Sequence, residues 1–300
     1  MKSDWVSLIF LAVKCAVALG AGCFLLTFIL LWKNIQPLRS PFLPLEKASL
    51  PTEEVTFQTS DGLHLKGSLS LLDPVRPTIL LCHGVGANRR DLSPFAQLLY
   101  EKGRMNVFLF DFRAHGESEG RLTSYGAYEQ RDLEAALAFL DQRVPRKEYG
   151  FMGISMGGSV GILVASHDKR LKALWVDSPY INLAETMEAY MRLLYHLPRF
   201  PFGPFTLNSY WLLFRTSAWE ISPINAVERL APRPLMIVNG LADERIPPAL
   251  AQRLYEKAKE PKSLWLIPGA GHLEGHQVNP TEYDERLLSF FKKALSENSF

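Results

Sequence analysis

Eight strand-like runs alternate with helical patterns over most of this 300-residue chain, and the alternation limits the folds open to it. From the third run onward a helical pattern separates most neighbouring runs, which predicts a mostly parallel sheet with helices on both faces. The first two runs meet at Asp61-Gly62, a dipeptide typical of tight antiparallel turns. We therefore expect an α/β fold whose functional groups lie at the carboxyl ends of the strands. The runs cover residues 54–59, 63–71, 78–82, 106–111, 149–153, 173–177, 235–239 and 263–267.

Residues 153–158, Gly-Ile-Ser-Met-Gly-Gly, place Ser155 between glycines at the end of the fifth run and directly before an apolar helical stretch. A strand, a sharp turn and a helix in this order are typical of a nucleophile elbow, where a serine hydroxyl is exposed on a strained turn. The alternative is a serine that only caps the helix. Because the motif is short, partners elsewhere in the chain must distinguish the two.

A serine nucleophile needs a histidine that accepts its proton. His272 follows the apolar run 264–267 in a loop bracketed by glycines, which would present an imidazole at the end of a strand. His276 is the alternative, four residues further along. We favour His272 because its loop directly follows the strand.

The histidine in turn needs an acid that orients its ring. Asp243 follows the strand-like run 234–239 and a short turn. Asp177 also ends a predicted strand and is the alternative acid. Two backbone amides are expected to bind the developing oxyanion: that of Met156, directly after the serine, and that of Val85, in the glycine-rich loop after the third run.

These motifs together resemble the α/β-hydrolase superfamily, over about residues 52 to 295. Within it the chain is similar to serine-aminopeptidase-like (S33-type) hydrolases that include Bem46-type membrane-anchored members. The resemblance implies a serine, acid, histidine order, a helical cap over the site and no metal or organic cofactor. Ala114 departs from the pattern, since many relatives carry glycine there. The motifs that carry the resemblance are 83–86 (His-Gly-Val-Gly), 111–118, 153–158, 243–247 (Asp-Glu-Arg-Ile-Pro) and 269–272 (Gly-Ala-Gly-His).

The N-terminal segment predicts a membrane anchor. Residues 15–32 are eighteen in a row without a charge, enough to span a bilayer core. A cleaved signal peptide is the alternative, but residues 30–34 offer no small-residue cleavage pattern. We expect a single-pass anchor over 1–35, a proline-rich linker over 36–51 and a hydrolase domain over 52–300. The flanking lysines and arginines are too evenly placed to orient the anchor.

Between residues 179 and 223 the alternation stops and aromatic residues accumulate. We interpret this segment as a helical cap whose apolar side lines an acyl-binding groove, with Phe202, Phe205 and Trp211 as expected substrate contacts. The alternative is an aromatic segment that simply packs on the core.

Composition excludes several other functions. A net charge of +2 offers no strong electrostatic attraction for nucleic acid, and Cys15, Cys23 and Cys82 form neither a disulfide framework nor a metal-ligand cluster.

From the motifs, the apolar N-terminal segment and the aromatic segment together, we expect a membrane-anchored serine hydrolase that cleaves a carboxylic ester or thioester of a small molecule or lipid with an acyl chain. A serine peptidase and a catalytically silent binding protein are the alternatives. The oligomeric state stays open.

Overall fold

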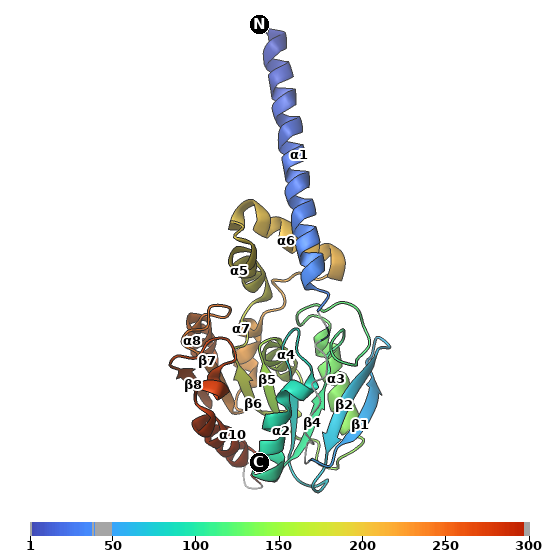
Figure 1. Cartoon of the computed structure of the whole chain (residues 1–300), viewed down its shortest axis with the longest axis vertical. Coiled ribbons are helices and arrows are strands. Elements are labelled where there is room, and N and C mark those ends of the chain that lie inside the picture. Colours follow the sequence, from blue (N-terminus) through green and yellow to red (C-terminus); the bar gives the residue numbers. More distant parts are fainter. Residues whose placement is uncertain (1, 38, 40–49, 297–300) are drawn as a thin grey trace.

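An eight-stranded sheet forms the centre of the molecule (Figure 1). The computed structural model describes residues 2–37, 39 and 50–296. Its strand order is β1-β2-β4-β3-β5-β6-β7-β8, in which β2 pairs antiparallel with β1 and β4 and the remaining neighbours are parallel. The mostly parallel sheet predicted from the sequence is thus confirmed. The strands are β1 Glu53–Gln58, β2 His64–Ser70, β3 Thr78–Cys82, β4 Asn106–Phe110, β5 Tyr149–Ile154, β6 Leu171–Asp177, β7 Leu235–Gly240 and β8 Lys262–Ile267.

The burial of each strand follows from its place in the sheet. The central strands β3 and β4 are buried along their whole length and are apolar except for Thr78 and Asn106 at their starts, since helices cover both of their faces. The edge strand β1 alternates exposed and buried residues, because solvent reaches one of its faces. The antiparallel turn between β1 and β2 contains Gly62 at φ +92°, a backbone conformation that glycine adopts readily.

Helices cover both faces of the sheet, so the molecule has two apolar cores. One core packs α3, α4 and α8 against the sheet, and the other packs α2 and α10 against the opposite face. Short 3₁₀ helices at Arg89–Leu92 and Val227–Leu230 precede α2 and β7 in the chain. The helices are α1 Lys2–Asn34, α2 Ser93–Glu101, α3 Glu129–Leu140, α4 Met156–Ala165, α5 Leu183–Tyr195, α6 Arg199–Phe214, α7 Pro223–Ala226, α8 Pro248–Lys257, α9 Gly275–Val278 and α10 Pro280–Ala294.

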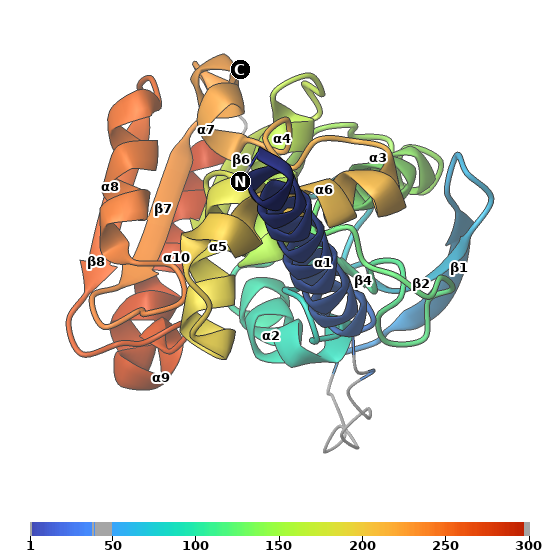
Figure 2. The same ribbon diagram turned by 90° about the horizontal axis from the view of Figure 1, so that it is seen from above.

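Two helices, α5 and α6, lie between β6 and β7 in the chain and form the expected cap above the carboxyl ends of the strands (Figure 1). The side chain of Asn182 caps α5 by accepting a hydrogen bond from the backbone N–H of Glu185. Seen from above, α5 and α6 lie on either side of α1 (Figure 2). The cap and the N-terminal helix therefore form one assembly over the sheet.

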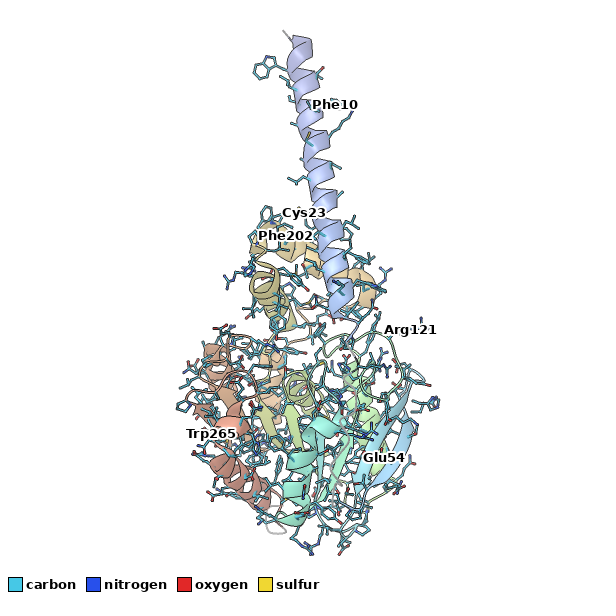
Figure 3. The ribbon with its side chains drawn as sticks, in the orientation of Figure 1. Phe10, Cys23, Glu54, Arg121, Phe202 and Trp265 are labelled. Carbon is cyan, nitrogen blue, oxygen red and sulfur yellow. The ribbon has the colours of Figure 1, made fainter. Side chains whose placement is uncertain are left out.

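Helix α1 has two parts with opposite surroundings. Its N-terminal part extends away from the domain and exposes apolar side chains such as Phe10, which is 65% exposed (Figure 3). Its C-terminal end packs against the cap, so that Thr27, Leu31 and the following Ile35 are buried. The helix is long and apolar enough to cross a membrane. Most of the predicted linker, residues 38 and 40–49, lies outside the described residues.

Candidate active site

The strand β5 passes into helix α4 through Ser155, whose backbone has φ 49° and ψ −120°. This conformation is strained for a residue with a Cβ atom and is typical of a serine at a nucleophile elbow. The turn is possible because the flanking glycines lack side chains. A Cβ atom at Gly153 would lie 2.6 Å from the backbone nitrogen of Gly158, and one at Gly157 would lie 2.6 Å from the carbonyl oxygen of His83.

His272 lies between Ser155 and Asp243. Its Nε2 is 3.3 Å from the Ser155 Oγ, and its Nδ1 is 2.8 Å from the Asp243 Oδ2. The ring is 11% exposed and the carboxylate is fully buried, so water has little access to the contact between them. An Nδ1–H that donates to Asp243 leaves Nε2 free to accept the serine proton. The structure thus joins in one hydrogen-bonded chain three residues that span 117 positions of the sequence.

Asp243 is held in place by the turn that follows β7. Its Oδ1 accepts hydrogen bonds from the backbone N–H groups of Arg245, at 2.9 Å, and Ile246, at 2.8 Å. Because these donors are part of the main chain, the carboxylate cannot rotate without losing them. These bonds direct its other oxygen, Oδ2, at His272.

The two alternative residues from the sequence have other partners. The Nε2 of His276 contacts the Asp284 Oδ1 at 3.0 Å, on the side of α10. Asp177 accepts hydrogen bonds from the hydroxyl groups of Tyr283, at 2.8 Å, and Ser178, at 2.9 Å. Burial disfavours the charged form of Asp177 and raises its pKa to about 6, although both hydrogen bonds act in the opposite direction.

The loop after β3 lies beside the serine. A Cβ atom on Gly84 would lie 3.1 Å from the Ser155 Cβ, and Val85 lines the same cavity as Ser155. His83 holds this loop, because its Nδ1 donates to the Gly84 carbonyl at 2.7 Å and its Nε2 accepts from the Phe112 N–H at 3.1 Å. Burial lowers the pKa of His83 to about 3, so the ring is neutral near pH 7. Met156 begins α4, where backbone N–H groups are available to an anion.

A cavity of about 230 Å³ opens beside Ser155. Most of its wall is apolar or aromatic, and Arg245 supplies the only charge among the described lining residues. The wall comes from the cap helix α5, the loops around Ser155 and the end of α1. The lining residues are Leu31, Asn34, Val85, Tyr125, Ser155, Met156, Tyr180, Leu183, Thr186, Met187, Tyr190, Met191, Leu194, Tyr195, Thr206, Arg245 and Ile246.

The cap lines this cavity with residues other than the expected ones. Phe202, Phe205 and Trp211 are not among the described lining residues. Phe205 packs edge-on against Phe24 of α1, with ring centroids 6.1 Å apart, and Trp211 is 51% exposed. The reason is the way α6 packs: its side that includes Thr206, Tyr210 and Phe214 is buried toward the domain, and Thr206 reaches the cavity. Phe205 instead faces α1, and Trp211 is exposed.

Helix α1 and the loop before α3 also contribute to the wall, which the sequence motifs did not predict. Leu31 and Asn34 line the cavity, and the hydroxyl group of Tyr125 donates to the Asn34 carbonyl at 2.8 Å. No local pattern marks these residues, since they lie about 90 positions apart. Arg245 was within reach of sequence reasoning, because it lies in the same short motif as Asp243.

A larger cavity, of about 1030 Å³, lies at the opposite edge of the sheet around the amino ends of β7 and β8. Charged side chains such as Lys262 and Arg286 line it, and it does not include Ser155 or His272. The larger cavity is therefore not the candidate active site, because the hydrogen-bonded serine and histidine lie at the smaller one.

Comparison with known proteins identifies the family of the fold. The family model described as "Alpha/beta hydrolase family" matches residues 79–286. The chain is 30% identical to the uncharacterized protein YqkD of Bacillus subtilis over 234 residues, which is 76% of this chain and 75% of that protein. It is 29% identical to the uncharacterized protein YfhR of Escherichia coli K12 over 254 residues, which is 81% of this chain and 82% of that protein.

Solved structures show the same architecture. The esterase Pf2001 of Pyrococcus furiosus superposes with a TM-score of 0.70 at 28% identity, covering 87% of this chain and 99% of that one. Est1E of Butyrivibrio proteoclasticus, solved with ferulic acid, has a TM-score of 0.66 and covers 81% of this chain and all of that one. At 20% identity, the likeness to Est1E concerns the fold alone.

Proposed function

This chain belongs to the alpha/beta hydrolase family, and from that premise we propose that it is a membrane-anchored serine hydrolase that cleaves a carboxylic ester or thioester. The proposed nucleophile is Ser155, the base is His272 and the orienting acid is Asp243. The observation that carries the proposal is the hydrogen-bonded chain from the strained serine through the imidazole to the buried carboxylate. The serine-aminopeptidase-like, Bem46-type subtype is part of the same proposal.

In the proposed mechanism, His272 Nε2 takes the proton of Ser155 as the serine oxygen attacks the carbonyl carbon. The carbonyl oxygen becomes an oxyanion, which the backbone N–H groups of Val85 and Met156 bind; in comparable sites one such donor is worth about 3 kcal/mol. The imidazolium then protonates the departing alcohol or thiol and leaves an acyl-enzyme on Ser155. Water, deprotonated by the same histidine, attacks this ester and releases the carboxylic acid.

An acyl ester fits the cavity better than a peptide. The described lining is largely apolar, with leucine, methionine and tyrosine side chains that suit a hydrocarbon chain. A peptide would bring several backbone donors and acceptors, which such a wall leaves unpaired at a cost in free energy. The similar protein of Pyrococcus furiosus is an esterase by description, which favours the same chemistry.

Helix α1 is the proposed anchor. It presents an exposed apolar surface from Trp5 to Leu25, and its end is built into the domain. Asn34 donates a hydrogen bond to the Tyr195 hydroxyl at 2.6 Å, and the Thr123 N–H donates to the Ile35 carbonyl at 2.8 Å. Removing this helix as a signal sequence would take away part of the cavity wall, so we propose that it is retained.

A fluorophosphonate probe tests the nucleophile directly, because it reacts with activated serines. We expect the full-length protein in detergent to be labelled and the Ser155→Ala variant to remain unlabelled. The two histidines make a matched pair, since His272→Ala should abolish labelling whereas His276→Ala should retain it. Folded protein that resists the probe, or labelling that survives in Ser155→Ala, would reject the serine hydrolase.

A substrate series then separates esterase from peptidase. We expect hydrolysis of nitrophenyl esters to rise with acyl length until the cavity is filled, and aminoacyl anilides to react poorly. Faster cleavage of the anilides would replace the esterase proposal with the peptidase alternative.

A further inference from the structure

The cap also exposes large apolar side chains from both of its helices. Phe200 is 80% exposed, Leu194 is 52%, Trp211 is 51% and Leu212 is 42%. We call these four residues the outer cap surface. Large apolar side chains left exposed on two helices that pack together are candidates for contact with another apolar body.

Helix α6 is apolar on both of its sides. Its buried side includes Tyr210 and Phe214, and its exposed side belongs to the outer cap surface. Between Arg199 and Arg215 it has no charged residue. The guanidinium of Arg215 lies 5.3 Å from the centre of the Trp211 ring. An uncharged apolar and aromatic stretch suits contact with lipid, and an arginine at its end, such as Arg215, can extend its guanidinium toward the polar interface.

The length of α1 fixes how near the cap comes to the lipid. Crossing a hydrocarbon core of about 30 Å takes roughly 20 residues. A span that begins at Trp5, the start of the apolar stretch, therefore ends no earlier than about Phe24. Alternatively, the span covers residues 15–32, which places the exposed Lys14 at the membrane boundary farther from the domain. This span ends still closer to the domain.

Helix α6 meets α1 inside that span in both registers. Phe205 packs against Phe24, and a Cβ atom on Gly20 would be only 3.9 Å from the Phe205 ring. Figure 3 shows Phe202 close to the level of Cys23. If α1 crosses a bilayer, α6 must therefore share the lipid with it.

We propose that the outer cap surface is inserted in the same lipid layer as α1, so that the cavity takes acyl chains directly from the bilayer. Leu194 connects the outer cap surface with the cavity, since it belongs to that surface, where it is half-exposed, and also lines the cavity. This inference rests on the anchor and on the acyl ester substrate proposed above, and it adds the route by which the substrate arrives.

Fluorescence quenching in vesicles tests the insertion without relying on activity. Phe200→Cys and Leu212→Cys, in full-length protein with Cys15→Ala and Cys23→Ala, would each carry a bimane label. The vesicles would contain phosphatidylcholine, phosphatidylglycerol and a doxyl-labelled lipid. Val17→Cys on α1 is the control for lipid contact. Val75→Cys is the matched exposed apolar control, since it lies before β3 at the amino ends of the parallel strands.

We expect doxyl lipid to quench the labels at 200 and 212 at least about half as strongly as the label at 17, and to leave the label at 75 nearly unchanged. Quenching at 17 with none at 200 and 212 would overturn the insertion while leaving the anchor intact. That result includes the case in which a second copy or a soluble partner covers the surface. Absence of quenching at 17 would reject the anchor and this inference with it.

Activity supplies a second measurement. Phe200→Glu should lower kcat/KM on a long-chain ester embedded in vesicles by roughly tenfold, because it places a charge in the interface. The same variant should change hydrolysis of a soluble short-chain ester by less than about twofold, and Val75→Glu should change neither. Equal losses on both esters, or none on either, would contradict the proposed route.

Discussion

Asp177 ends β6 and Asp243 lies in the turn after the neighbouring strand β7, and the two are almost equally buried, at 5% and 3% exposure. Either would satisfy a rule that places the acid after a strand. Only one of the two hydrogen-bonds His272 among the described contacts: Asp243 Oδ2, at 2.8 Å from Nδ1. Asp177 instead faces α10, where Tyr283 donates its hydroxyl proton.

The difference lies in what surrounds each carboxylate. Backbone N–H groups from the turn after β7 hold Asp243, and they come from its own loop. Asp177 depends on side-chain hydroxyl groups, one of them from a helix 106 residues away. A carboxylate held by main-chain donors keeps a fixed direction, which is what an orienting acid requires. Asp177 lacks such main-chain donors among the described contacts, and its hydrogen bonds instead connect β6 with α10.

The largest expected effect comes from Asp243→Asn. The amide can donate a hydrogen bond to Nδ1, which would favour the wrong imidazole tautomer, so we expect kcat to fall by roughly 10³- to 10⁴-fold. Steady-state hydrolysis of a nitrophenyl ester measures it, with the melting temperature as a check on folding. A loss smaller than tenfold in folded protein would reassign the acid.

Asp177 should instead affect how stability depends on pH. Its pKa is about 6 in the folded protein and about 3.8 when exposed. Between these values the folded state retains a proton that the unfolded state releases, so the contribution of Asp177 to the free energy of unfolding falls as pH rises from about 4 to 6. The change is about 3 kcal/mol, since one pKa unit is worth about 1.36 kcal/mol.

Urea unfolding of the wild type and of Asp177→Asn at several pH values measures this change. From about pH 4 to 6 the free energy of unfolding of the wild type should fall relative to that of Asp177→Asn, and above about pH 6 the difference should become constant. A difference that stays constant from pH 4 to 7 would show that Asp177 titrates normally.

A smaller effect is expected from Tyr283→Phe, which removes the donor to Asp177 and the acceptor of the Trp175 Nε1–H at 3.1 Å. Leaving these buried groups unpaired should lower the free energy of unfolding by about 1 to 3 kcal/mol. Losing the donor should also raise the pKa of Asp177 further, which extends its pH window upward. Thermal unfolding across pH tests both effects, and unchanged stability would contradict the hydrogen bonds.

The smallest expected effect is that of Asp177→Asn on catalysis. Because Asp177 contacts Tyr283 and Ser178, we expect kcat near pH 7.5 to change by about threefold or less. The comparison with Asp243→Asn under the same conditions is decisive. Two equal losses would mean that both carboxylates act on His272 and that the contrast between them is wrong.

Much of the fold was predictable because its signals are local. Apolar runs gave the strands to within about two residues, and Asp61-Gly62 marked the antiparallel turn. The glycines around Ser155 marked a turn that few sequences allow. The catalytic roles of Ser155, Asp243 and His272 stay predictions that the geometry supports.

The cavity wall was not predictable in the same way. Aromatic residues of the cap suggested an acyl groove, but Phe205 faces α1 and Tyr190 of α5 lines the cavity instead. Which side of a helix faces the site depends on how it packs, and α6 could not be oriented without knowing that α1 lies against it.

The sequence by itself determined the sheet, the serine on its strained turn and the chain order of serine, acid and histidine, because apolar periodicity, glycine and motif spacing act over short stretches. Only the tertiary structure decided that Asp243, and not Asp177, reaches His272, and that the end of α1 closes the cavity. Those outcomes depend on hydrogen bonds and packing between residues up to about a hundred positions apart, which no local pattern encodes.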